Sequence, residues 1–121
     1  MPVTGLDFVS LHVRDLEGSA AFYERFLGLT RAPSSPPHAV VFATTPIAFA
    51  VREQVGVDLE ADGDPGRGIA VWLHATDVRA IHDALVEAGT TIASGPVDGP
   101  FGLTFAFVDP DGYLITLHDR G

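Results

Sequence analysis

The chain has 121 residues, which is enough for one compact domain and too few for two of ordinary size. Hydrophobic residues make up 46% and charged residues 19%, so the chain can bury a core, and global disorder is excluded. It contains no cysteine, which excludes a disulfide framework, and no apolar run long enough for a membrane span. These features predict a cytoplasmic protein with no membrane partner. The net charge of −9 repels phosphate backbones and argues against a nucleic-acid partner.

The first half of the chain predicts a strand, a helix and three further strands. Residues 6–13 alternate in the manner of a strand, and Asp15 then stands at the N-cap position of a helix. Apolar spacing predicts that helix over residues 16–27, and Gly28 ends it. Three runs with strand character follow, at residues 29–32, 38–43 and 47–52.

The second half repeats this order. Ile69, Val71 and Leu73 alternate as in a strand, and either Thr76 or Asp77 caps a helix. That helix is expected near residues 77–88, with Gly89 at its end, and has an apolar stripe of Val78, Ile81, Leu85 and Val86. Three more runs with strand character close the chain, at residues 90–93, 101–108 and 113–118.

This repetition indicates a tandem duplication. The predicted fold is α+β, with two β-α-β-β-β modules over about residues 5–52 and 68–119 that form cupped mixed sheets around a ligand cavity. Residues 53–67 are acidic and rich in Gly, Pro and Asp, as linkers are. The whole chain, residues 1–121, is expected to be a single domain.

The turn Asp109-Pro110-Asp111-Gly112 predicts which side of the last strands faces the helix. Its residues suit a type I turn closed by a glycine bulge, which pairs Asp109 with Tyr113. Phe105, Phe107, Tyr113, Ile115 and Leu117 then share the helix-facing side. The opposite side mixes polar and apolar residues in the proportion of a cavity wall. We expect the corresponding side of the other strands to line the same cavity. The residues expected to contact a ligand are Phe8, Ser10, His12, Arg52 at the end of a strand of the first module, Trp72, His74, Thr104, Leu114, Thr116 and His118.

Two stretches carry a resemblance to a known family. VSLHVRDLEGSAAFYERFLGL (Val9–Leu29) resembles the opening signature of glyoxalase, bleomycin-resistance and extradiol-dioxygenase proteins, and FGLTFAFVDPDGYLITLHD (Phe101–Asp119) resembles their closing signature. With the duplicated module, the resemblance to this vicinal oxygen chelate superfamily covers nearly the whole chain. It implies the fold more strongly than any one chemistry, because one fold hosts many functions.

The resemblance also bears on a metal. Metal-dependent members hold a divalent ion with His and Glu side chains, and the corresponding positions here are Phe8, Gly68 and Thr116. Phe and Gly have no donor atom, and a lone Thr hydroxyl is a poor ligand for a divalent metal. We therefore expect no metal and no cofactor. The metal-free relatives, such as the bleomycin-binding proteins, sequester a drug rather than convert it.

Three functions remain in view. The first is metal-independent binding of a small apolar or aromatic molecule, in the manner of antibiotic sequestration, in which Trp72 offers a stacking surface and no residue is catalytic. The second is a glyoxalase-like lyase, isomerase or dioxygenase that uses His12, His74 and His118, with a displaced metal or as a metal-free acid–base catalyst. The third is a structural or regulatory dimer with a vestigial cavity. A homodimer is expected in each case, since exposed sheet edges are usually covered and the relatives commonly pair.

Overall fold

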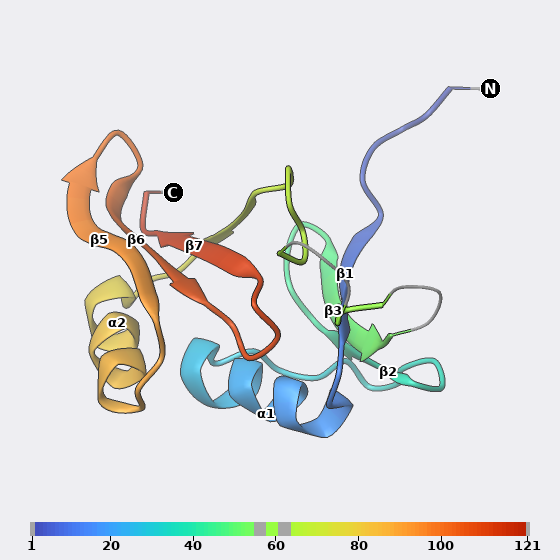
Figure 1. Cartoon of the computed structure of the whole chain (residues 1–121). Coiled ribbons are helices and arrows are strands. Elements are labelled where there is room, and N and C mark those ends of the chain that lie inside the picture. The colour runs from blue at the N-terminus through green and yellow to red at the C-terminus, as the bar shows by residue number, and fades with distance from the viewer. Residues whose placement is uncertain (1, 55–57, 61–63, 121) are drawn as a thin grey trace. The chain divides into compact units, whose positions relative to one another are not determined.

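The structure, a computed structural model, describes residues 2–54, 58–60 and 64–120. The chain divides into two compact units, Met1–Ala61 and Asp62–Gly121, and this boundary falls within the predicted linker 53–67. Residues 55–57 and 61–63 of that linker lie outside the described residues. Each unit contains one helix and one mixed sheet, which confirms the predicted α+β class (Figure 1).

The first unit follows the predicted order of elements. Its elements are β1 (Phe8–Val13), α1 (Leu16–Leu27), β2 (Ala39–Phe42) and β3 (Ala48–Glu53). The sheet order is β1-β3-β2, with β1 parallel to β3 and β2 antiparallel to it. Helix α1 packs against β3 and β2, where the ring of Tyr23 contacts the rings of Phe42 and Phe49.

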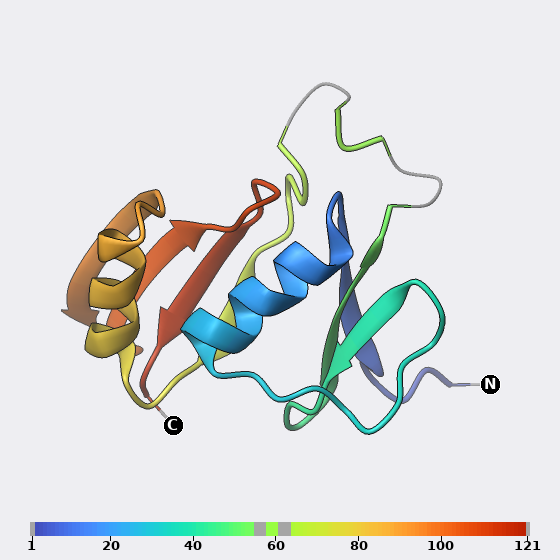
Figure 2. The same ribbon diagram turned by 90° about the horizontal axis from the view of Figure 1, so that it is seen from below.

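The second unit repeats this topology with one more strand. Its elements are β4 (Val71–His74), α2 (Val78–Glu87), β5 (Ile92–Gly99), β6 (Gly102–Val108) and β7 (Leu114–His118). The sheet order is β4-β7-β6-β5, with β4 parallel to β7. Helix α2 lies along one face of this sheet, against β5 and β6 (Figure 2). The parallel first and last strands of both units support the tandem duplication.

The strand expected at residues 29–32 is reduced to a single bridge, between Arg31 and Phe42. Ala32 N donates to Val41 O and Ala43 N donates to Thr30 O, each at 2.8 Å, so this stretch occupies the place that β5 has in the second sheet. A continued ladder would need Val41 N to donate back to Ala32, but Val41 N donates to Ser35 Oγ at 2.9 Å instead. The duplication is therefore complete in topology but shortened at this edge.

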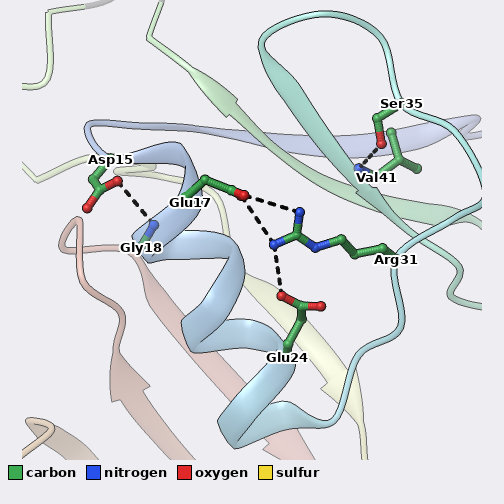
Figure 3. Close-up of polar contacts among 7 residues, drawn as sticks. All are labelled: Asp15, Glu17, Gly18, Glu24, Arg31, Ser35 and Val41. Atoms are coloured by element: carbon green, nitrogen blue, oxygen red, sulfur yellow. Dashed lines mark hydrogen bonds and ion pairs between the residues drawn. The ribbon is translucent and has the colours of Figure 1, made fainter.

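Helix α1 begins and ends as its sequence predicts. The Asp15 side chain accepts a hydrogen bond from Gly18 N at 3.1 Å (Figure 3), and Gly28 ends the helix with φ 69° in the left-handed region. Helix α2 also lies between its predicted residues, Asp77 and Gly89, although its cap contacts are weaker. Asp77 stands at its N-cap without a side-chain hydrogen bond to the helix, and Ala88 is its C-cap, with Gly89 following at φ 85°.

An ion-pair network joins the surface of α1 to the residues after it (Figure 3). Arg31 donates to Glu24 at 3.0 Å and to Glu17 at 3.2 Å. These hydrogen bonds raise the pKa of Arg31 above its ordinary value. Close by, Ser35 Oγ accepts from Val41 N at 2.9 Å. The polar contacts tie the bridge at Arg31 to the helix and to β2.

The helix-facing side of the second sheet confirms the register predicted from the turn. Asp109 N donates to Tyr113 O at 2.9 Å and Gly112 N donates to Asp109 O at 3.0 Å, which closes the expected three-residue loop. The five residues predicted for this side are all buried, at 8% exposure or less: Phe105, Phe107, Tyr113, Ile115 and Leu117.

The sequence pattern was wrong for two apolar residues, Ile69 and Val86, which it assigned to a strand and to the apolar stripe of a helix but which are exposed. Ile69 precedes β4 in a turn, where its N–H donates to Gly66 O, and it is 74% exposed. Val86 lies on α2 but is 50% exposed, outside the buried stripe that includes Val78 and Leu85. Among the described residues, no helix is both long enough and apolar enough to cross a membrane.

Candidate ligand-binding site

In the first unit, four predicted site residues share the sheet face that α1 leaves uncovered. Register places Phe8 beside Ala48, Ser10 beside Ala50, and His12 beside Arg52. Leu11, Val13, Phe49 and Val51 alternate with them and are buried on the helix side. Phe8 is 58% exposed, although it is a large aromatic residue. The first sheet therefore presents an aromatic ring at one end of this face and a cation at the other.

Arg52 has an unusual environment on this face. Its Nε is buried and has no hydrogen-bond partner among the described residues. A buried donor without an acceptor costs about 1–3 kcal/mol, so such a group calls for an explanation. A ligand acceptor near the guanidinium would suit it, because the planar fork of Arg matches carboxylate and phosphate groups.

In the second unit, the other six predicted site residues share the face opposite α2. Trp72 on β4 pairs with Thr116 on β7, and His74 pairs with His118. His118 in turn lies beside Thr104 on β6. Leu114 has the same parity on β7 and is 51% exposed. The register predicted from the turn thus brings these side chains to one surface.

Four rings form a cluster on that surface, referred to below as the ring cluster: Trp72, His74, Phe101 and His118. The Trp72 ring lies 5.1 Å from the Phe101 ring at 61°, and 5.9 Å from the His118 ring. His118 also contacts His74 at 5.7 Å and Phe101 at 6.1 Å. These edge and tilted arrangements are the ones that aromatic quadrupoles favour.

The ring cluster is open to solvent on its apolar side. Trp72 is 46% exposed and Phe101 is 52% exposed. His118 lies deeper, and its Nδ1 is buried without a hydrogen-bond partner among the described residues. Large apolar side chains that gather on one exposed surface mark a binding site more often than an accident of packing.

Phe101 is the site residue that the sequence did not predict. It lies in the tip that joins β5 to β6, where Gly99 pairs with Gly102. The sequence feature that could have indicated Phe101 is its place in a Gly-Pro-Phe-Gly turn, since turn tips are ordinarily polar. That signal marks an exposed ring but does not say which strand the ring will contact.

The predicted lack of a metal concerns Phe8, Gly68 and Thr116, and it stays a prediction. Within the described parts of either unit, no three His, Cys, Asp or Glu side chains gather closely enough to hold one. Gly68, at one of the positions where the metal-dependent relatives are expected to have a ligand, has φ 86° and no donor atom. Phe8 belongs to the first unit and Thr116, like Gly68, to the second, so the convergence of these three positions stays a prediction.

The Asp109 carboxylate of the closing turn has a structural role. Asp109 is buried, and its Oδ1 accepts from Asp111 N and Tyr113 N, both at 2.9 Å. These bonds organise the turn that sets the register of β7.

Two β-α-β-β-β modules, each with a sheet face clear of its own helix, define the class of fold. Comparison with known proteins identifies which class this is. The model of the Glyoxalase/Bleomycin resistance protein/Dioxygenase superfamily matches residues 5–117. The chain belongs to that superfamily, and the resemblance seen in its opening and closing motifs is confirmed.

Individual relatives are distant. Virulence protein STM3117 of Salmonella typhimurium is 25% identical over 122 residues, which cover 97% of this chain and 85% of the relative. The structure of TnmS3, an antibiotic binding protein from Streptomyces sp. CB03234, is 25% identical with a TM-score of 0.71, covering 100% of this chain and 99% of that one. FosX, a fosfomycin resistance protein from Listeria monocytogenes in complex with Mn(II) and sulfate, is 19% identical with a TM-score of 0.74, covering 99% and 93%. The FosX likeness shows the fold alone.

Proposed function

We propose that this protein binds a small, planar, apolar or aromatic molecule without a metal, in the manner of antibiotic sequestration. The observation that carries the proposal is the ring cluster, in which Trp72 and Phe101 are each about half exposed on the face opposite α2. Covering apolar surface stabilises a complex by about 25 cal/mol per Å². A flat ligand is suited to the exposed parts of these rings.

Two further features support sequestration. The relative TnmS3 is an antibiotic binding protein and shares 25% identity over the full length of this chain. The net charge of −9 attracts a basic ligand. Neither feature names the molecule. The relative favours an antibiotic, and the net charge favours a basic group on it, whereas Arg52 Nε, unpartnered among the described residues, suits an acceptor group.

The metal-free part of the proposal rests on residue chemistry. Phe8, Gly68 and Thr116 replace the side chains with which metal-dependent relatives are expected to hold their ion. Without those donors, the protein has no evident means of polarising a substrate carbonyl or activating oxygen through a Lewis acid. Binding, rather than conversion, is the activity that the remaining side chains suit.

Fluorescence tests the binding directly, because Trp72 is the only tryptophan in the sequence. We expect titration with planar aromatic antibiotics, and with the planar cation 9-aminoacridine, to quench or shift its emission to saturation. Elemental analysis of the same purified protein should find no stoichiometric divalent ion. If none of these compounds perturbs Trp72, or if a bound metal is found, the proposal is wrong.

The enzyme alternative makes a different prediction for the histidines. His74 and His118 are in ring contact at 5.7 Å, so an acid–base pair on this face is the arrangement that a catalyst would use. Under that alternative, His118→Ala abolishes turnover of a bound compound and leaves its affinity nearly unchanged. Under sequestration, product analysis by mass spectrometry finds the ligand intact after long incubation with the wild type.

A further inference from the structure

The tip between β5 and β6 is held by the two residues that follow β7. Asp119 Oδ1 accepts from Leu103 N at 2.8 Å. Arg120 N donates to Phe101 O at 3.1 Å, and the Arg120 guanidinium donates to Pro100 O at 2.8 Å. Three hydrogen bonds therefore join residues 16 to 20 positions apart in the chain; two end on the tip that carries Phe101, and the third ends at the start of β6.

Gly102 makes room for this contact. Its φ of 81° lies in the left-handed region, and a Cβ at this position would collide with the Asp119 carboxylate. The backbone of the tip and the Asp119 side chain thus fit each other closely. A side chain at position 102 would either strain the tip or expel the carboxylate.

Burial does not hold Phe101 in place, because the residue is 52% exposed. Its ring nevertheless lies 5.1 Å from Trp72 and 6.1 Å from His118. The hydrogen bonds to its own carbonyl, to the carbonyl of Pro100 and from Leu103 N are what define its position. An exposed ring that is fixed before binding loses less conformational entropy when a ligand arrives.

We propose that Asp119 and Arg120 are positioning residues that fix Phe101 as a wall of the ring cluster. The expected effect of Asp119 on ligand affinity rests on the proposed function, but the position of the Phe101 ring can be measured without any ligand. Asp119 supplies an acceptor to the backbone next to Phe101, and Arg120 holds the carbonyls of Pro100 and Phe101. Neither side chain needs to touch the ligand.

A matched pair of substitutions tests the role of Asp119. Asp119→Ala removes the acceptor, whereas Asp119→Asn keeps an oxygen at the same place. We expect Asp119→Ala to abolish the nuclear Overhauser effects between the Trp72 and Phe101 rings in the ligand-free protein and to speed hydrogen exchange at Leu103 N. Asp119→Asn should retain both signals. With 9-aminoacridine as the probe, Asp119→Ala should weaken affinity roughly 2- to 10-fold, the cost of ordering one side chain on binding.

The outcomes separate this inference from the proposed function. If the nuclear Overhauser effects between the Trp72 and Phe101 rings persist in Asp119→Ala, the positioning role is wrong, regardless of any result on ligand binding. If Asp119→Ala loses these Overhauser effects but binds 9-aminoacridine with unchanged affinity, Asp119 positions Phe101 but Phe101 takes no part in binding. That result would also overturn the proposal. If the wild type fails to bind 9-aminoacridine, the result counts against the proposed function. The Overhauser effects in the ligand-free protein would still decide whether Asp119 positions the Phe101 ring. If Asp119→Ala does not fold, Arg120→Ala, which removes the bond to Pro100 alone, decides by the same measurements.

Discussion

Trp72→Ala is the most informative test of the ring cluster, and its effect can be worked from the exposure of the indole. A tryptophan side chain offers up to about 250 Å² of contact area. Because Trp72 is 46% exposed, roughly 100 Å² of it is available to a ligand. At about 25 cal/mol per Å², covering all of this area contributes roughly 2.5 kcal/mol and covering half contributes roughly 1.2 kcal/mol. Affinity should therefore fall between roughly 8- and 70-fold.

The assay must not depend on the residue that is removed. Isothermal titration calorimetry with 9-aminoacridine, or with the tightest antibiotic found by fluorescence, measures the affinity of wild type and variant alike. Trp72→Phe keeps an aromatic face and should lose less than Trp72→Ala. Val86→Ala is the matched control, because Val86 is 50% exposed on α2, which covers the other face of the sheet. An affinity for Trp72→Ala within about twofold of wild type, or an equal loss in Val86→Ala, would refute the assignment of the ring cluster.

Three further predictions concern stability, metal and assembly. Asp109→Ala should lower the free energy of unfolding in urea by about 2–4 kcal/mol, because two amides lose their buried acceptor; Asp109→Asn should lose less, and an equal loss would contradict the role given to the acceptor oxygen. Treatment with EDTA should leave the melting temperature within about 1 °C, because no metal binding is linked to folding; a larger drop would restore the histidine metal-site alternative. Sedimentation velocity at micromolar concentration should show a homodimer, and a clean monomer would contradict that prediction.

Much of the fold could be predicted because its signals are local. The Asp15 cap and Gly28 act within one turn of α1, so the bounds of that helix were predicted correctly. The turn at Asp109 sets the pairing of β6 with β7, and alternation then assigns every residue of both strands to a face. The side chains of β6 and β7 on the open face of the second sheet were therefore predicted from the sequence.

Elsewhere, local pattern was insufficient. Residues 29–32 have the composition of a strand, yet they form one bridge, because Val41 N donates to Ser35 Oγ rather than back to Ala32. Ile69 continues the alternation of β4 in sequence, but the chain turns at Gly66 and leaves it exposed. In both cases the hydrogen bonds of neighbouring residues override the apolar pattern.

The sequence by itself indicated the superfamily through the resemblance of its opening and closing motifs. It determined the duplicated module, the helix bounds and most residues of the open sheet faces through periodicity, caps and one turn. The tertiary structure alone decided that Phe101 joins Trp72 and His118. That contact depends on hydrogen bonds from Asp119 and Arg120 to a tip 16 to 20 residues earlier in the chain. No local pattern encodes such a contact, because its geometry exists only once β6 and β7 are paired and the chain beyond β7 returns to the tip.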